Sequence, residues 1–416
     1  MLSNILKRPQ NIQTIYLYLV LGNTLATSFI WGINTIFLLS AGLSNFEAFL
    51  ANAFFTLGEV IFEIPTGIIA DTWGRRTSYL LGTITLAAST ALYLIMWETK
   101  GPFWGWAASS ILLGLGYTFF SGATEAWLVD ALHATNFKGT LDSVFSKGQI
   151  IGGVAMLIGS IGGGILAQFT NLGAPYILRS LILLVNFLTA FFLMKDLGFS
   201  PKKMDPVKEM KNIFTKSIDS GLKNPPVRWL MLAAPFTSGV SFYIFYALQP
   251  YLLKLYGNDK AYGIAGLAAA ITSLSLIAGG FLAPRLRKVF SRRTSILFFG
   301  IFFSGVLLII VSGIVNFWIA LFLIFIWGLI FASLTPVRQA YLNGIIPSEQ
   351  RATVLSFDSL MSSSGGIFIQ PILGKVADIS GYPASYLVSS VFQFAALPFI
   401  YMTRRENAKS DKITEK

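Results

Sequence analysis

Residues 296–315 read ILFFGIFFSGVLLIIVSGIV, a run of twenty residues without a charged side chain. About twenty apolar residues in a helix are needed to cross the roughly 30 Å hydrocarbon core of a bilayer. A strand of a membrane barrel would instead alternate apolar and polar residues over about ten positions, and this run does not alternate. Because lipid offers the backbone no hydrogen-bond partners, a run of this kind must be helical. The stretch therefore predicts a transmembrane helix.

Similar runs recur along all 416 residues, of which 54% are hydrophobic and 12% are charged. A soluble domain carries about 25% charged residues, so the composition predicts an all-α polytopic membrane protein. We expect no cleavable signal peptide, because the apolar run after Lys7 and Arg8 is too long for one. The predicted spans are 13–38, 45–70, 77–97, 103–132, 144–170, 174–195, 227–253, 261–287, 294–314, 316–345, 353–379 and 383–403.

The net charge of +12 comes from basic residues that lie in every second connection between spans, such as Arg75 and Arg76. This alternation is typical of the cytoplasmic loops of a membrane protein, so we expect no nucleic-acid partner. It predicts that both termini are cytoplasmic and that the protein lies in the plasma or inner membrane, as a monomer in contact with lipids. With no cysteine and a single histidine, no metal or cofactor is expected.

A polar, lysine-rich segment at 196–226 divides the chain into two halves. It predicts two six-helix bundles, at 1–195 and 227–405, followed by a cytoplasmic tail at 406–416. Residues 207–222 within the linker form either an amphipathic helix on the membrane surface or a solvated segment. The halves also look like repeats, since GLGYTFFSGATEAWL (114–128) aligns with GLIFASLTPVRQAYL (328–342) and GGILAQ (163–168) aligns with LGKVAD (373–378).

The strongest local motif is GIIADTWGRR, residues 67–76, between the second and third spans. Gly67 would let another helix approach closely. Asp71 is placed to accept hydrogen bonds from the N-terminus of a neighbouring helix. Gly74 permits a tight turn, and Arg75 and Arg76 hold the loop on the cytoplasmic side.

With twelve spans, a repeat of six, a long central loop and this motif, the chain resembles the major facilitator superfamily. The resemblance implies alternating access to a cavity lined by spans one, four, seven and ten. It also implies that Asp71 binds near Ser356 and that Arg75 pairs with Asp130, which latches the outward-facing state. The chain resembles the drug–proton antiporter branch, with two departures: Ser160 stands where those proteins often carry a proline, and span four lacks their early arginine.

Acidic residues inside the spans are the candidates for proton coupling, because a charge at the centre of a membrane helix costs about 2.5–3.5 kcal/mol on insertion scales. Glu59 and Glu63 lie one helical turn apart on one face of the second span. Two carboxylates this close repel each other, which favours the binding of a proton. The alternative is a structural role, such as a local interaction with the backbone freed by Pro65.

A third acid, Glu125, lies in the fourth span, and Arg338 lies at a similar depth in the tenth, next to Gln339. We hypothesise that Glu125 and Arg338 form a gate or a substrate-sensitive ion pair across the cavity. The alternative is that each extends to the inner membrane surface.

Two stripes at helical spacing predict the lining of the substrate cavity. Their alternative role is hydrogen bonding between helices. The stripes are formed by Asn23, Thr27, Trp31 and Asn34 in the first span and by Phe242, Phe245 and Gln249 in the seventh.

The sequence contains no phosphate-binding loop and no nucleophile paired with a base, so we expect neither an enzyme nor an ATP-driven pump. The leading hypothesis is a secondary active transporter that exports small amphipathic or drug-like compounds in exchange for protons. One alternative is a proton-coupled importer or facilitator of a small metabolite. Another, from a different class, is a membrane sensor or lipid-handling protein on the same fold.

Overall fold

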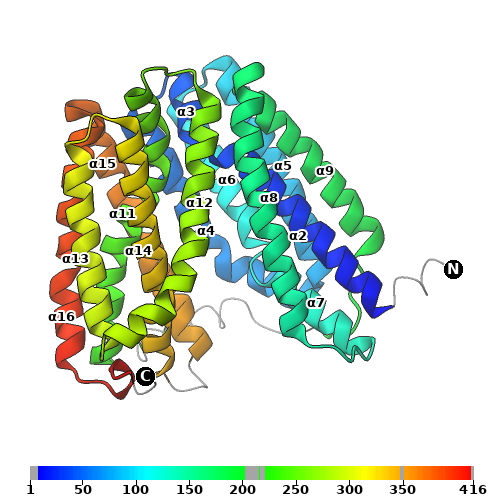
Figure 1. Cartoon of the computed structure of the whole chain (residues 1–416). Coiled ribbons are helices and arrows are strands. Elements are labelled where there is room, and N and C mark those ends of the chain that lie inside the picture. Colours follow the sequence, from blue (N-terminus) through cyan, green and yellow to red (C-terminus); the bar gives the residue numbers. More distant parts are fainter. Residues whose placement is uncertain (1–7, 202–214, 216–220, 347–350, 414–416) are drawn as a thin grey trace. The chain divides into compact units, whose positions relative to one another are not determined.

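The computed structural model describes residues 8–201, 215, 221–346 and 351–413. Its helices in the first half are α2 (Pro9–Trp31), α3 (Asn34–Ser40), α4 (Asn45–Trp73), α5 (Arg75–Thr99), α6 (Phe103–Thr118), α7 (Ala123–Ala134), α8 (Leu141–Phe169) and α9 (Ala174–Leu193) (Figure 1). Those in the second half are α11 (Pro225–Tyr256), α12 (Tyr262–Val289), α13 (Arg293–Ser312), α14 (Phe317–Asn343), α15 (Arg351–Ala395) and α16 (Leu397–Arg405), followed by a 3₁₀ turn, η3 (Lys409–Asp411).

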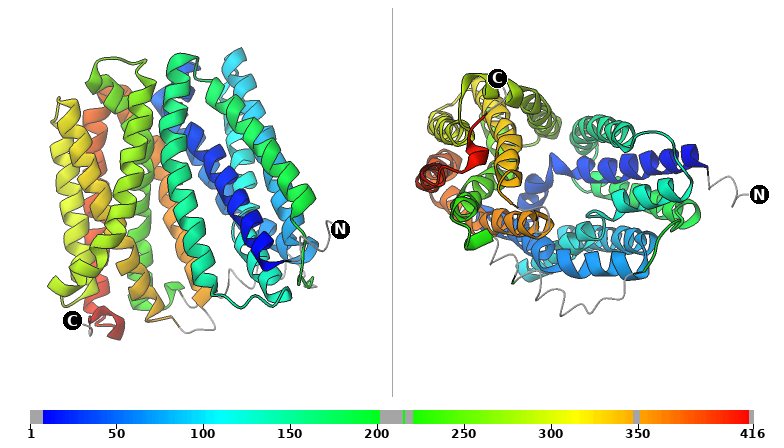
Figure 2. Two further views of the ribbon diagram at one scale, coloured as in Figure 1. Left: turned by 45° about the vertical axis from the view of Figure 1, so that its right-hand side comes forward. Right: turned by 90° about the horizontal axis from the view of Figure 1, so that it is seen from below.

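The fold is all-α, as predicted, and ten of the described helices are long and apolar enough to cross a membrane. Figure 2 shows the same helical architecture from two further sides. Two differences in boundaries separate these ten helices from the twelve predicted spans. The predicted span 103–132 is divided into α6 and α7. The last two predicted spans, 353–379 and 383–403, are two helical segments that meet at Gly381, where φ is 80°, and they count as one long helix.

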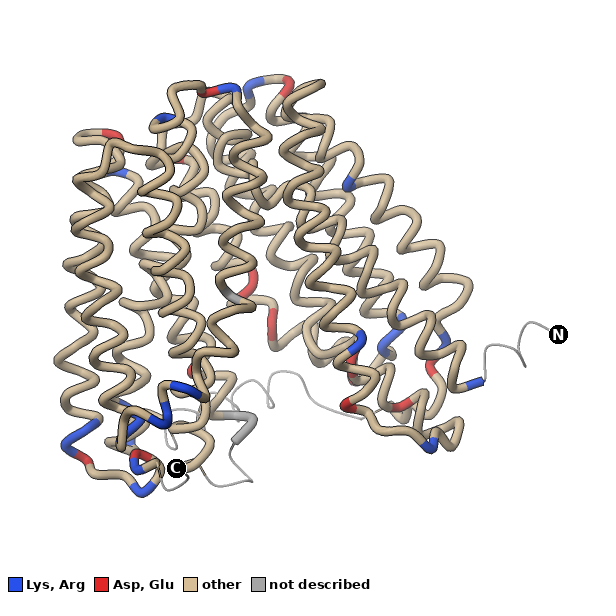
Figure 3. The backbone as a smooth tube through the Cα atoms, viewed as in Figure 1, with Lys and Arg blue, Asp and Glu red and all other residues tan. Residues whose placement is uncertain are grey.

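The first predicted span is also divided, into α2 and α3, at residues 32–33. The segment 207–222, expected as either a surface helix or a solvated linker, lies almost entirely outside the described residues. Figure 3 shows that Lys and Arg gather near the ends of the helices, with few charged residues along their middles. That distribution is expected of helices whose central turns face lipid or one another.

Contacts within the chain group it into two compact units. The first comprises Met1–Gly42, Phe54–Pro206 and Ala261–Ala270, and the second comprises Leu43–Ala53, Val207–Lys260 and Ile271–Lys416. The helices α4 and α12 therefore each have their first residues in one unit and their remaining residues in the other.

In the first unit α2 packs closely against α8. Ser28 on α2 donates a hydrogen bond of 3.2 Å to the carbonyl of Ala155 on α8. About two turns further along α8, a side chain at Gly163 would overlap the carbonyl oxygen of Phe29, which follows Ser28 on α2. Glycine lets the two backbones approach without a side chain between them, which is how many membrane helices associate.

The second unit uses the same device between α11 and α15. A side chain at Gly365 on α15 would overlap the carbonyl of Pro235 on α11. Further along the same pair, the Tyr243 hydroxyl donates to Ser385 at 2.5 Å. Asp378, also on α15, accepts hydrogen bonds of 2.8 and 2.9 Å from the backbone N–H groups of Asn45 and Phe46, and so caps the start of α4 within this unit.

The loop after α4 is fixed by an aspartate that lies far away in the sequence. Gly74 adopts φ 104°, and α5 begins at the next residue. Asp196, which follows α9, accepts a hydrogen bond of 2.9 Å from the backbone N–H of Arg76. The Arg76 side chain donates to the carbonyl of Phe191 at 2.7 Å. Asp196 therefore caps α5 and fixes the end of the GIIADTWGRR motif in the first unit.

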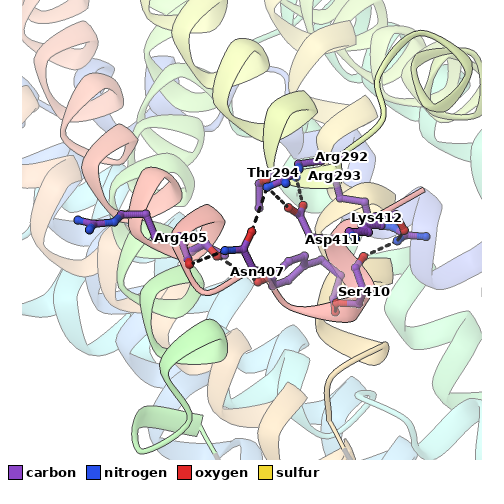
Figure 4. Close-up of polar contacts among 10 residues, drawn as sticks. Arg292, Arg293, Thr294, Arg405, Asn407, Ser410, Asp411 and Lys412 are labelled. Carbon is purple, nitrogen blue, oxygen red and sulfur yellow. Dashed lines mark hydrogen bonds and ion pairs between the residues drawn. The ribbon is translucent and has the colours of Figure 1, made fainter. Parts of the chain in front are cut away.

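An equivalent cap closes the second unit (Figure 4). Asp411, which follows α16 and is 2% exposed, accepts a hydrogen bond of 2.8 Å from the backbone N–H of Thr294 in the first turn of α13. Arg293 donates to the carbonyl groups of Ser410 and Lys412. The described part of the predicted tail thus packs against α13. In each half an aspartate after the last helix caps the third long helix, as duplication of a six-helix unit would produce.

Replacing Gly163 with valine should destabilise the first unit. The added side chain would overlap the backbone of α2, and overpacking of this kind costs about 1–3 kcal/mol. We expect a lower Tm of the purified protein in detergent. Gly280→Val on α12 is the matched control, because a side chain there would meet no described atom within 4 Å. Equal Tm values for the two variants would contradict the close contact of α2 with α8.

Replacing Asp196 with alanine should lower the free energy of unfolding by about 1 kcal/mol, the usual cost of a lost helix cap. Asp196→Asn keeps the acceptor oxygen and should be tolerated.

Burial, opposed by the hydrogen bond and charge of Arg76, raises the pKa of Asp196 above its ordinary 3.8. The folded chain therefore holds this proton more tightly than the unfolded chain does, and the stability it contributes is lost as the pH rises through the folded pKa.

The check is chemical unfolding of wild type and Asp196→Asn in detergent between about pH 4 and about pH 7. The stability of wild type relative to Asp196→Asn should fall as the pH rises. A relative stability that instead rises with pH would show that the carboxylate gains more from Arg76 than it loses by burial.

Candidate functional site

The two acids of the second predicted span lie on α4 in the first unit, but their surroundings differ. Glu63 is exposed, and its carboxylate accepts a hydrogen bond of 2.6 Å from the Ser121 hydroxyl, in the turn between α6 and α7. Glu59 is half-buried. In the described part of the chain no hydrogen bond or ion pair reaches its carboxylate. One acid is therefore held in place by a neighbour, and the other is not.

The neighbourhood of Glu59 is tightly built on one side. Gly114 on α6 packs so closely that a side chain there would lie 2.7 Å from the backbone nitrogen of Glu59. One turn further along α6, the ring of Tyr117 stands edge-on to Phe55 at 5.7 Å between centroids. The helix that carries Glu59 is thus fixed by its neighbour, while the carboxylate itself keeps no described partner.

Glu125, the third predicted coupling acid, lies elsewhere in the first unit. It is exposed in the first turn of α7, which begins after Gly122 adopts φ 66°. A carboxylate in this position interacts favourably with the positive end of the helix dipole. The break between α6 and α7 was not predicted, and it places the acid expected in the cytoplasmic half of the fourth span at the start of a separate helix.

The motif residues of the predicted gate form a different ion pair from the implied one. Arg75 at the start of α5 binds Asp71 near the end of α4 at 2.6 Å, across the turn at Gly74, whereas the resemblance implied a pair with Asp130. A side chain at Gly67 would meet no described atom of the first unit within 4 Å. Gly74 forms the turn with its φ of 104°, and Arg76 holds it through hydrogen bonds to Asp196 and Phe191. Asp196 was missed, because nothing in the local motif points to a residue 120 positions away.

The stripe predicted in the first span is engaged in contacts between helices. Tyr117 on α6 donates to the Thr27 hydroxyl at 3.0 Å, and Tyr176 on α9 donates to Asn34 at 3.1 Å. Asn34 is buried and lies on α3, beyond the break in the span. Asn23 and Trp31 are half-buried on α2. These contacts match the alternative considered for the stripe, hydrogen bonding between helices.

Behind this stripe lies a fully buried cation, Arg179 on α9. Its guanidinium donates to the Thr90 hydroxyl at 3.0 Å and to the Tyr117 hydroxyl at 3.4 Å, and lies 5.8 Å from the Tyr117 ring centroid. In the described residues one of its terminal nitrogens has no hydrogen-bond partner. A hydrogen-bond chain thus runs from Arg179 through Tyr117 to Thr27.

The residues of the stripe predicted on α11 differ in how far they are buried. Gln249 is fully buried within the second unit, whereas Phe242 and Phe245 are half-buried. A fully buried glutamine packs between helices rather than lining an open cavity, which again agrees with the alternative considered for the stripes.

Arg338 and Gln339 on α14 line a cavity of about 550 Å³ inside the second unit. The guanidinium of Arg338 binds Asp358 on α15 through two hydrogen bonds of 2.5 Å. The hypothesis had paired Arg338 with Glu125, but Asp358 is the carboxylate that it reaches within its own unit. Asp358 was overlooked although it lies inside a predicted span, which is the signal that singled out Glu59.

Comparison with known proteins agrees with this architecture. The family model described as Major Facilitator Superfamily matches residues 17–289 and 260–416. The multidrug resistance protein MdtG of Salmonella arizonae is 24% identical over 328 residues, 78% of this chain and 77% of its own. MdtG of Proteus mirabilis is 26% identical over 341 residues, 80% of this chain and 79% of its own.

Solved structures show the fold at lower identity. The nucleoside transporter NupG superposes with a TM-score of 0.75 at 12% identity, covering 94% of this chain and 99% of NupG. A bacterial homologue of the human lysosomal transporter Spinster gives 0.73 at 14% identity, covering 97% of this chain and 98% of its own. The chain therefore belongs to the Major Facilitator Superfamily, and it is a multi-pass membrane transporter and not an enzyme.

Proposed function

We propose that this transporter exports small amphipathic or drug-like compounds in exchange for protons, and that Glu59 carries the proton. The observation that carries the proposal is the contrast between the two acids on α4. Glu63 is hydrogen-bonded to Ser121, whereas the half-buried Glu59 has no partner among the described residues. An unpaired charge at membrane depth is costly, and binding a proton removes that cost.

Coupling requires that the protonated and ionised forms of Glu59 prefer different conformations. The backbone at Glu59 is in tight contact with Gly114 on α6, so a change in the charge of Glu59 would act on the packing of these two helices. A proton can shift such an equilibrium only through its different affinity for the two states. Glu63 and Glu125 have supporting parts in the proposal, as the hydrogen-bonded neighbour and as an exposed acid at a helix end.

The two MdtG relatives support export of drugs, since both are called multidrug resistance proteins. The Asp71–Arg75 pair, with Gly67, Gly74, Arg76 and Asp130, is proposed as the gate. Of the residues expected to line the cavity, the proposal keeps Asn23, Trp31, Phe242, Phe245, Arg338 and Gln339. It assigns Thr27, Asn34 and Gln249 to contacts between helices. We further propose a monomer in the plasma or inner membrane with both termini in the cytoplasm.

The test is transport by the purified protein in proteoliposomes with an imposed pH gradient. Three probes of different charge are offered: ethidium, dansylglycine and dansylglycinamide. Wild type should accumulate at least one of them against its concentration gradient. Glu59→Gln should reduce this accumulation at least about tenfold, equivalent to about 1.4 kcal/mol. Glu63→Gln is the matched control one helical turn away and should keep most of it.

Three results would contradict the proposal. Accumulation by Glu59→Gln at the wild-type level would show that another group carries the proton. Movement of a probe down its gradient without any response to pH, in wild type and variants alike, would show a facilitator. Accumulation in the same direction as the proton would make the protein an importer.

A further inference from the structure

The cavity in the second unit has the composition of a binding site for an amphipathic molecule. It lies among α11, α13, α14, α15 and α16, and its volume of about 550 Å³ falls within the usual range of about 300–1,000 Å³ for small-molecule sites. Aliphatic side chains such as Leu230, Ile301 and Leu334 form one part of its wall. Hydroxyl groups, including those of Thr237 and Ser362, form another part.

Among the residues that line this cavity, only Arg338 and Asp358 are charged, and their charges are opposite. They are bound to each other through both guanidinium terminal nitrogens and both carboxylate oxygens. The side chain of Arg338 is 22% exposed and that of Asp358 is 9% exposed. A molecule in the cavity therefore has more access to the guanidinium than to the carboxylate.

The chemistry of the pair also favours the arginine as the group that binds a ligand. A guanidinium has five N–H donors, and the two hydrogen bonds to Asp358 leave three. Its planar fork matches carboxylate, sulfonate and phosphate groups. When the cavity holds no anion, Asp358 balances the charge of Arg338, because an unpaired buried arginine would be costly.

We propose that this cavity binds the anionic group of a small amphipathic compound, with Arg338 as its anchor, Asp358 as an internal competitor, and the aliphatic wall in contact with the apolar part. An incoming anion takes donors of Arg338 that Asp358 would otherwise hold. This inference deepens the proposed function by naming the chemical class of substrate, and it rests on that function only in treating the ligand as a substrate.

The test is calorimetric titration of the purified protein in detergent, with a titration into empty micelles as the blank. The probes share one aromatic group and differ in charge: dansylglycine is anionic, dansylglycinamide is neutral and dansylcadaverine is cationic. Wild type should bind dansylglycine at least tenfold more tightly than the amide. Asp358→Asn should bind dansylglycine more tightly still, because the competing charge is gone.

The double variant Arg338→Gln with Asp358→Asn replaces the ion pair by two neutral side chains of similar shape and so avoids leaving a buried charge unpaired. With an unchanged Tm it should lose the preference for dansylglycine. Arg285→Gln is the matched control, because Arg285 is exposed on α12 and is not among the residues that line the cavity. It should bind all three probes as wild type does.

Several outcomes would overturn the inference: no binding of dansylglycine to wild type, equal affinity for the anion and the amide, or an unchanged preference in the double variant. Tightest binding of dansylcadaverine, lost in Asp358→Asn, would assign the cavity to cations. Because no pH gradient is present in this experiment, its failure is distinguishable from a failure of proton coupling at Glu59.

Discussion

Every backbone N–H and C=O inside a bilayer must find its partner within the chain, because lipid supplies none. Helices satisfy this requirement along their length, and the remaining choices concern how helices touch and how they end. Contacts are made by backbone against backbone, as at Gly163 with Phe29 and at Gly365 with Pro235. The backbone N–H groups at the starts of helices are bound by carboxylates that lie far away in the sequence. Asp196 caps α5 and Asp411 caps α13. The two halves solve the problem in the same way.

The same lack of water makes each charge within the helices costly, and the described residues meet this cost in two ways. Arg338 and Asp358 neutralise each other. Arg179 is surrounded by hydroxyl groups and an aromatic ring. Glu59 has neither kind of partner among the described residues. A proton is the remaining means of neutralising Glu59, and this difference is why the proposal assigns proton coupling to Glu59 rather than to the other buried charges.

The apolar runs predicted the all-α fold because a span is determined by composition alone. The breaks within spans were not predictable in the same way. The turn between α6 and α7 depends on Gly122 at positive φ, inside a predicted span. Gly122 lies among many other glycines, and sequence does not show which one adopts the rare conformation. The kink at Gly381, by contrast, lies between the predicted spans 353–379 and 383–403.

The sequence predicted which residues of the candidate site are unusual, but it did not predict which residues they would contact. Glu59, Glu63 and Arg338 stood out because charge in a span is rare. Their partners are set by tertiary packing: Ser121 for Glu63 and Asp358 for Arg338. Thr27 and Asn34 lie at helical spacing in the predicted stripe. Residues that line a cavity and residues that pack between helices show the same spacing. Only the contacts with Tyr117 and Tyr176 separate the two.

The central claim, that Glu59 couples protons to transport, is tested most directly by asking whether a compound can drive protons. Proteoliposomes containing a trapped pH-sensitive dye are given a gradient of whichever probe the protein transports, with no initial pH difference. The account predicts that protons move opposite to the probe in wild type and in Glu63→Gln, and that no protons move in Glu59→Gln. Proton movement of wild-type size in Glu59→Gln, or transport by wild type without any proton movement, would contradict it.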